Sequence, residues 1–288
     1  MHNRMILIFA FLWTAFGLTV SPVLAQGHPS PASAHSAAAA SGWTLPKDTA
    51  VVSHGPRSWR FSVVYNIADS TGQIVRRQRV AGDYTRGLPQ DQVEWQNVTV
   101  EDANGAAGPF GAPQKQSYMD GFRYRDDANS LAPNFFKSFP PAAVMERNLV
   151  WDTNMFEMFG QRYLSQLKLN QPIHAIPNQN IEMPGVGTIR NHDVALEWVG
   201  RSRRNGQECA LIDYRAFFNP LHIDNGGVKL DGRSDYWGEI WVSLATRQIE
   251  YATLYEEVTG EMQLPGQTAP QPLSIFRIGS FQPVSAGH

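Results

Sequence analysis

Apolar and polar residues alternate with a period of two over most of the chain beyond about residue 45. This pattern predicts β-strands that each bury one face. In the first such segment Phe61, Val63 and Tyr65 share one face. Residues 69–72 (Asp-Ser-Thr-Gly) supply turn chemistry and predict a hairpin whose return strand covers 74–84.

The same alternation predicts further strands on both sides of a single helix. We expect them at residues 93–100, 118–124, 194–198, 210–214, 237–244, 248–258 and 273–281. The apolar phase slips between Trp95 and Val98, which predicts a bulge near Gln96. The pair Asn205-Gly206 is a strong signal for a tight hairpin turn.

One helix is expected at residues 141–168, where apolar side chains recur at the helical spacing. Pro141 suits its first turn, and Gly160 is expected to bend or split it. An extended, irregular connection is expected where Pro172, Pro177 and Pro184 lie, and a loop is expected at the Asp- and Gly-rich residues 224–235. The pattern as a whole predicts a mainly β fold, a single curved antiparallel sheet or half-barrel with one main α-helical insertion covering it.

The first 44 residues differ in composition from the rest. An apolar run follows Arg4 and ends in small residues, which predicts a signal peptide over residues 1–25 and export to the periplasm or the extracellular space. Residues 26–44 are rich in Ala, Ser and Pro and predict a flexible tether. Residues 45–288 are then expected to form a single antiparallel β domain.

Charge gives little indication of a macromolecular partner. The formal net charge is -2, so no nucleic-acid partner is expected. The arginine clusters at 76–79 and 201–204 are interpreted as solvated strand and turn positions, with contact to anionic lipid head groups as the alternative. Beyond the leader no segment approaches about 20 uninterrupted apolar residues, so no transmembrane span is expected in the mature chain.

No motif for catalysis or metal binding stands out. No two histidines have the close spacing of zinc ligands, and the Gly-x-Ser-x-Gly elbow of α/β-hydrolases is missing from the sequence. Cys209 is the only cysteine, which excludes an intramolecular disulfide. We therefore expect no metal and no cofactor, and the sequence favours a role without chemistry while leaving open whether the chain is an enzyme.

Two groups of side chains are candidates for ligand binding. Aromatic residues at alternate positions of the last long hairpin are expected to form a cross-strand wall, and Met and Phe residues of the helix could adapt to an irregular apolar ligand. These candidate ligand-binding residues are Trp237, Trp241, Tyr251 and Tyr255 in the hairpin and Met155, Phe156, Met158 and Phe159 in the helix. For both groups an ordinary packed core is the alternative interpretation.

The order of these features resembles the half-barrel fold of bacterial lipoprotein carriers of the LolA/LolB type. The similarity lies in the signal peptide, the early hairpins, the strand 118–124 with its Asp-Gly turn before aromatic residues, and the closing hairpin from Gly238 to Glu257. The resemblance implies a curved sheet covered by helices around an apolar cavity for acyl chains.

The leading hypothesis is an exported β-rich protein that binds an apolar or amphipathic ligand, such as a lipid, without chemistry. One alternative is a cell-envelope hydrolase or lyase acting on glycans through acidic residues in 224–261, where the candidates are Glu239, Glu250, Glu256, Glu257 and Glu261. A second alternative is a structural envelope or interaction module. An open apolar cavity beneath the 141–168 helix would favour the first hypothesis, and a filled one would favour the last.

Overall fold

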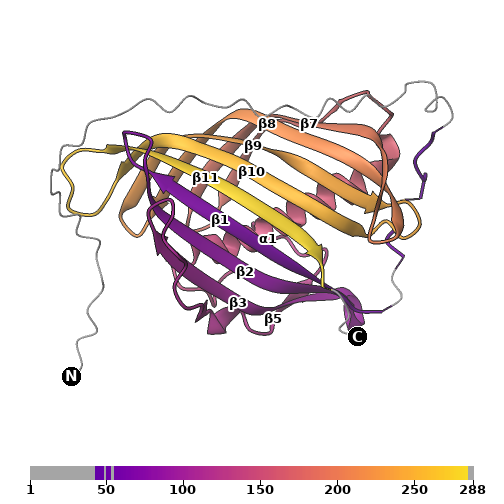
Figure 1. The fold of residues 1–288 in the computed structure, drawn as a ribbon, viewed down its shortest axis with the longest axis horizontal. Helices are drawn as coiled ribbons and strands as arrows, with labels where there is room; N and C mark the ends of the chain where they lie inside the picture. The colour runs from indigo at the N-terminus through magenta and orange to yellow at the C-terminus, as the bar shows by residue number, and fades with distance from the viewer. Residues whose placement is uncertain (1–42, 49, 53–54, 285–288) are drawn as a thin grey trace. The chain divides into compact units, whose positions relative to one another are not determined.

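The computed structural model describes residues 43–284 except 49, 53 and 54. Its strands form one 11-stranded antiparallel sheet in the order β4-β3-β2-β1-β11-β10-β9-β8-β7-β6, with β5 also paired to β3 (Figure 1). The strands are β1 (Arg57–Ala68), β2 (Ile74–Leu88), β3 (Gln92–Asn104), β4 (Gln114–Lys115), β5 (Phe122–Arg125), β6 (Ile173–Met183), β7 (Gly187–Arg204), β8 (Gln207–Asn225), β9 (Val228–Ser243), β10 (Ile249–Gln263) and β11 (Gln271–Pro283). The signal peptide predicted at 1–25 and almost all of the predicted tether lie outside the described residues.

The described part of the chain contains one α-helix, α1 (Val144–Glu157), which lies within the predicted range 141–168. It continues into a π-helical turn, Met158–Arg162, and a 3-10 turn, Leu164–Gln166. Gly160 lies in the π-helical turn, so the interruption expected there is confirmed. Elsewhere in the described residues, 3-10 turns lie at Pro89–Asp91 and Ser117–Met119.

The sheet curves around this helix. On one side the Tyr84 hydroxyl of β2 donates a hydrogen bond of 2.8 Å to Glu157 at the end of α1. On the other side the ring of Phe156 packs edge-on against Tyr214 of β8, with 6.3 Å between ring centroids. In the sheet order β2 and β8 lie on opposite sides of the central strands β1 and β11, yet both contact α1. The sheet therefore bends around the helix, and α1 lies on its concave face (Figure 1). The predicted mainly β architecture, with one helical insertion over a curved antiparallel sheet, is confirmed.

The predicted alternation and local irregularities are also found. Phe61, Val63 and Tyr65 are buried on the concave face. The pairing of β2 with β3 shifts register opposite Gly82, and Asn97 has a φ of 53°, which places the expected bulge next to Gln96. A Cβ at Gly82 would lie only 2.7 Å from Val98 Cγ2, so the glycine leaves the room that the bulged strand β3 occupies.

The turn Asn205-Gly206 joins β7 to β8, as predicted. Both residues have positive φ, 49° and 76°. This conformation suits Asn and Gly and matches the twist of the two strands.

Two predicted connections are strands instead. The segment around Pro177 is extended, as expected, but it forms the regular strand β6, so the prediction of an irregular connection was wrong. Because β6 is the last strand of the sheet order, it is an edge strand, where a proline without a donor N–H is tolerated.

The prediction of a loop at 224–235 was also wrong. Strand β8 runs to Asn225 and β9 begins at Val228, so the turn is confined to Gly226 and Gly227. Alternation of apolar residues through Leu221 and Leu230 continues the ladder on both sides of the turn.

Candidate functional site

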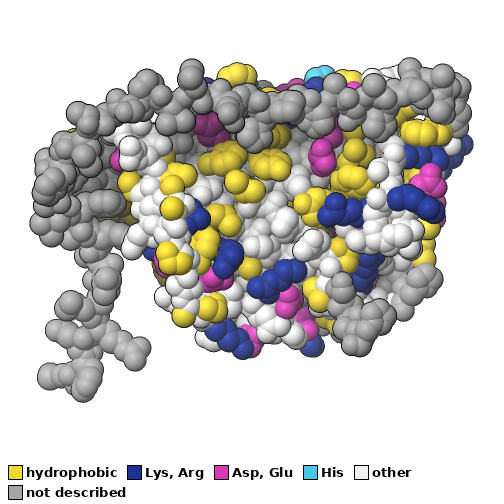
Figure 2. Space-filling model, in the orientation of Figure 1, with side chains coloured by type: hydrophobic (Ala, Val, Ile, Leu, Met, Phe, Trp, Pro, Cys, Tyr) yellow, Lys and Arg dark blue, Asp and Glu magenta, His cyan; other side chains and the backbone are white. Residues whose placement is uncertain are grey.

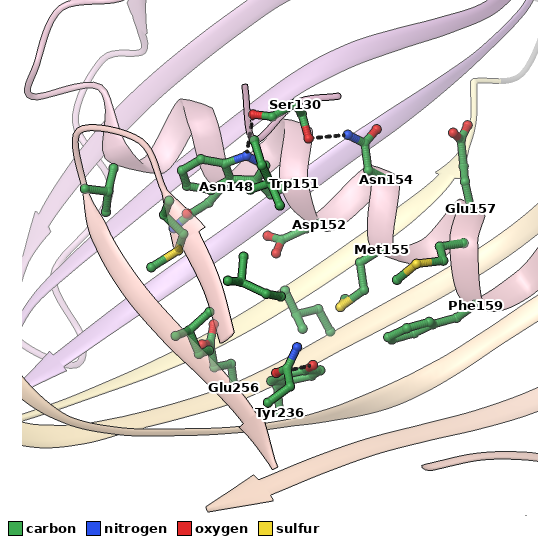
Figure 3. Close-up of a pocket in the computed structure, with 18 of the residues that line it drawn as sticks. Ser130, Asn148, Trp151, Asp152, Asn154, Met155, Glu157, Phe159, Tyr236 and Glu256 are labelled. Carbon is green, nitrogen blue, oxygen red and sulfur yellow. Dashed lines mark hydrogen bonds between the residues drawn. The ribbon is translucent and has the colours of Figure 1, made fainter. Parts of the chain in front are cut away.

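A cavity of about 660 Å³ lies between α1 and the concave face of the sheet (Figure 3). Small-molecule sites in proteins commonly span about 300–1,000 Å³. The apolar part of the lining includes Val144, Met155, Met158, Phe159, Ile176, Ile181, Met183, Val186, Ile189, Leu221, Ile223, Leu230, Leu254, Val258 and Ile275. The space beneath the helix is therefore not filled by the chain's own side chains.

One end of the cavity is apolar. Leu221, Leu230 and Val258 form a small buried cluster separate from the main core, and partly buried Met183 and Ile189 pack against it. All five side chains line the cavity near the β8–β9 turn. This end offers hydrocarbon contacts suited to the apolar part of a ligand.

A buried ion cluster of Asp152, Glu256 and Arg277 lies further along the same cavity. Arg277 donates from Nη1 to Glu256 and from Nη2 to Asp152. Arg277 is 7% exposed and Glu256 is 8% exposed. Ser234 Oγ donates to the second oxygen of Glu256 at 2.6 Å. Two carboxylates share one guanidinium, so the ion cluster carries one net negative charge when fully ionised.

Neutral polar groups surround the ion cluster. Tyr65 places its ring 5.0 Å from the Arg277 guanidinium carbon, and Asn148 Nδ2 donates to the Tyr65 hydroxyl at 3.1 Å. The Tyr236 hydroxyl donates to Asn191 Oδ1 at 3.0 Å. In Figure 3 Asp152 and Met155 extend from α1 toward the strand that carries Tyr236. The polar part of the cavity is thus held by hydrogen bonds from the helix and the sheet.

Burial sets the protonation of these groups. It raises the pKa of Asp152 to about 6, against the opposing effect of the Arg277 charge. Burial also raises the pKa of Tyr65 to about 12 and that of Tyr236 further. For Arg277 burial acts to lower the pKa, but the charges of Asp152, Tyr65 and Glu256 raise it well above its ordinary value. At neutral pH the arginine is charged, the tyrosines are neutral and Asp152 is mostly ionised.

At another part of the cavity lining, a second arginine, Arg86, is also shared by two carboxylates. Arg86 forms ion pairs of 2.8 Å with both Asp126 and Glu157. Burial raises the pKa of Glu157, which also accepts the Tyr84 hydrogen bond. These groups border a smaller adjoining pocket of about 140 Å³.

A short loop covers one side of α1 and completes the lining. The Ser130 carbonyl accepts a hydrogen bond of 3.2 Å from Trp151 Nε1, and the Ser130 hydroxyl accepts one of 2.9 Å from Asn154 Nδ2 (Figure 3). The loop around Ser130 is thereby tied to the helix that forms the roof of the cavity.

The four candidate ligand-binding residues of the helical segment do not all face the cavity. Met155, Met158 and Phe159 line the cavity. Phe156 is fully buried in the core, with its ring 5.5 Å from that of Phe61. The helix therefore brings three of these four predicted ligand-binding residues into the cavity.

The four aromatic candidates of the hairpin lie on the opposite, convex face of the sheet. Trp237 pairs with Tyr255 across the strands, with stacked rings 5.9 Å apart, and Trp241 pairs with Tyr251. Because side chains alternate along a strand, burial of Tyr236 against the concave side turns these residues outward. The predicted cross-strand pairs are present, but they are not part of the cavity. Figure 2 shows hydrophobic side chains on this face.

The acids of the glycan alternative are not gathered in the cavity. Glu239 and Glu257 are exposed. Glu250 is buried and paired with Arg57 at 2.6 Å, and Glu256 belongs to the ion cluster. The two buried acids of this set are therefore each already bound to an arginine.

The arginine cluster at 76–79 faces cross-strand carboxylates. Arg76 pairs with Asp102 and Arg79 with Glu101. The alternative interpretation of this cluster, contact with anionic lipid head groups, stays a prediction. In the part of the chain that the structure describes, no helix is long and apolar enough to cross a membrane, and no group of three or more His, Cys, Asp or Glu could hold a metal ion.

Sequence reasoning missed the three charges of the ion cluster as site residues. Asp152 and Arg277 are not among the predicted site residues, and Glu256 is predicted only as a candidate acid of the glycan alternative. A signal was present: Arg277 and Glu256 each occupy an inward position of an alternating strand, where an apolar residue is expected. A charge in that phase indicates a buried partner of opposite sign.

Comparison with known proteins gives only distant likenesses. No protein-family model and no curated protein matches the chain. Among solved structures, one concerning lipid–protein interactions in lipovitellin matches 80% of this chain at 12% identity and a TM-score of 0.43. The chain spans about 25% of that lipovitellin chain. A DUF1329 family protein from Desulfovibrio piger matches 82% of this chain and 89% of its own at 7% identity and a TM-score of 0.16. Scores this low do not establish a shared fold.

Proposed function

We propose that this chain is an exported protein that binds an amphipathic molecule, such as a lipid, non-covalently in the cavity beneath α1. The observation that carries the proposal is the unfilled space of about 660 Å³ between the helix and the sheet. A purely structural module would close this space with its own side chains, because empty apolar cavities cost stability.

The two parts of the cavity fit the two parts of an amphiphile. The apolar cluster near Leu221 can bury hydrocarbon, at about 0.8 kcal/mol for each methylene group. The ion cluster and its tyrosine and asparagine neighbours provide a polar region in the same cavity. A ligand with one apolar and one polar end makes better use of this lining than a pure hydrocarbon.

Export belongs to the proposal and is supported by the sequence pattern of residues 1–25. In the periplasm or outside the cell a protein of this kind would meet lipids and other amphiphiles of the cell envelope. The bound molecule would be carried or stored without chemical change.

Native mass spectrometry of protein purified without detergent tests the proposal. We expect a population whose mass exceeds that of the polypeptide by a lipid-sized adduct, and uptake of a fluorescent fatty amphiphile by the unloaded population. A single polypeptide mass together with no uptake of the fluorescent amphiphile would contradict the proposal.

A further inference from the structure

We infer that the cavity selects amphiphiles whose polar end is cationic and donates hydrogen bonds, with the Asp152 carboxylate as the group that receives it. This inference rests on the proposed function and names the class of ligand. It begins from the charge of the ion cluster, in which Asp152 and Glu256 share the single guanidinium of Arg277. A buried excess negative charge is costly, and a cationic ligand would neutralise it.

Of the arginines that line the cavity, Arg277 and Arg86 are each already paired with two carboxylates. Both terminal nitrogens of Arg277 are bound to carboxylates, and its Nε is sealed from the cavity, with less than 1 Å² exposed. Arg86 is shared by Asp126 and Glu157. The remaining arginine of the lining, Arg162, is exposed. Beside the ion cluster a carboxylate or phosphate would therefore meet guanidinium groups that are already paired with acids, and only the exposed part of the lining offers it Arg162.

Asp152, in contrast, has a free acceptor. Its Oδ2 receives the Arg277 hydrogen bond, and among the described residues no hydrogen bond to its Oδ1 is found. The side chain of Asp152 is 13% exposed and points from α1 toward the sheet (Figure 3). An ammonium group, which carries three donors and no acceptor, suits this position.

Among the residues that the structure describes, no other group facing Asp152 supplies the missing positive charge. The titratable and charged neighbours on the packed elements are Tyr65 of β1, Tyr214 of β8, Tyr236 of β9, Glu256 of β10 and Arg277 of β11. Burial raises the pKa of all three tyrosines, so they stay neutral at physiological pH. Asn148, one turn earlier on α1, is neutral and donates to Tyr65.

The inference predicts a pH dependence with a definite sign. An ammonium ligand needs the ionised form of Asp152, and burial raises the pKa of this group to about 6. Affinity for the amine should therefore be full above that value and decrease as the pH falls through it. An uncharged amphiphile of the same chain length should lack this decrease.

Isothermal titration calorimetry with dodecylammonium, 1-dodecanol and dodecanoate, each below its aggregation concentration, tests the inference on the full chain. At about pH 7.5 we expect the amine to bind about tenfold more tightly than the alcohol, and the acid to bind most weakly, because hydrogen bonds to charged groups are the strong ones. At about pH 5 the amine should lose most of this advantage.

The Asp152→Asn variant removes the proposed acceptor charge. Its preference for the amine over the alcohol should fall to within about threefold, and dodecanoate should bind more tightly than to the wild type. Asp213→Asn is the matched control: burial also raises the pKa of Asp213 to about 6, but this residue lies on the convex face beside Glu239. Its ligand preference should equal that of the wild type.

The outcomes separate this inference from the proposed function. Equal binding of the three ligands, or tightest binding of dodecanoate, would overturn the cationic preference and leave amphiphile binding intact. Failure of all three to bind would overturn both. If Asp152→Asn does not fold by circular dichroism, the pH dependence of the wild type decides the question.

Discussion

At the scale of single residues, the most consequential feature for stability and for the cavity is a set of charged side chains at positions where apolar side chains are expected. Arg277 lies two residues from Ile275 on the concave face of β11, and Glu256 lies between Leu254 and Val258 on β10. Buried ion pairs contribute little net stability, yet removing one partner is costly because it leaves the other charge uncompensated.

The Arg277→Met variant should therefore be strongly destabilised. It keeps most of the apolar stem but leaves Asp152 and Glu256 without their partner, and we expect a loss of about 3–5 kcal/mol in the free energy of unfolding. Urea denaturation followed by circular dichroism measures this loss. Arg125→Met is the control, since Arg125 and Asp127 form an exposed pair, and it should change stability little. Equal stability of the two variants would contradict this view of the ion cluster.

The sequence contains part of this information. An inward charge can be recognised from strand phase alone, as at Arg277, because Ile275 and Phe281 at alternate positions of the same strand are apolar. The partner cannot be recognised in the same way. Asp152 is 125 residues away, and the rotation of α1 over the sheet decides which helix residues meet β11.

At the scale of elements, alternation and turn chemistry predicted most strands because both act locally. The Asn205-Gly206 hairpin and the bulge beside Gln96 were predicted from residues that are adjacent or nearly adjacent in the sequence. The errors at Pro177 and at 224–235 share one cause. Proline, glycine and aspartate are typical of loops, but here an edge strand and a two-glycine turn accommodate them within the hydrogen-bonded ladder.

The interruption of the helix has a packing cause that can be tested. A Cβ at Gly160 would lie 3.0 Å from Ile240 Cγ2 and 3.1 Å from Val242 Cγ2, closer than most such contacts. Gly160→Val should therefore overpack this site and lower the unfolding free energy by about 1–3 kcal/mol.

Gly200→Val is the matched control, because a Cβ at Gly200 meets nothing within 4 Å. Thermal denaturation of both variants should show a clear decrease in Tm for Gly160→Val alone. A Gly160→Val protein with the wild-type Tm would contradict this prediction, because it would show that the packing between the π-helical turn and β9 can accommodate the larger side chain.

At the scale of the whole molecule the open cavity is the property that sequence patterns could not give. Strand phase predicts which residues face inward, but not whether their volumes fill the space under the helix. The helix candidates Met155, Met158 and Phe159 were predicted from the adaptability of Met and Phe side chains in the expected helix. The outward direction of Trp237, in contrast, depends on the register of β9. The aromatic pairs of the convex face stay a predicted binding surface separate from the cavity.

Filling the apolar end should abolish binding without unfolding the protein. Ile189 of β7 lines the cavity, and Ile189→Trp places a large side chain there. Its neighbour Thr188 faces the other side of the strand, so Thr188→Trp is the control. We expect Ile189→Trp to lose at least about tenfold in affinity for a fluorescent alkyl amphiphile, since several methylene contacts are lost. The Thr188→Trp variant should bind as the wild type does.

Photolabelling with an alkyl amphiphile that carries a diazirine in its chain, followed by mass-spectrometric mapping of the adducts, tests the central claim most directly. The account predicts adducts on peptides that line the cavity, above all those containing Met155, Ile189 and Leu221. Adducts confined to the convex aromatic residues around Trp237 and Tyr255, or no adducts above the level of denatured protein, would contradict it.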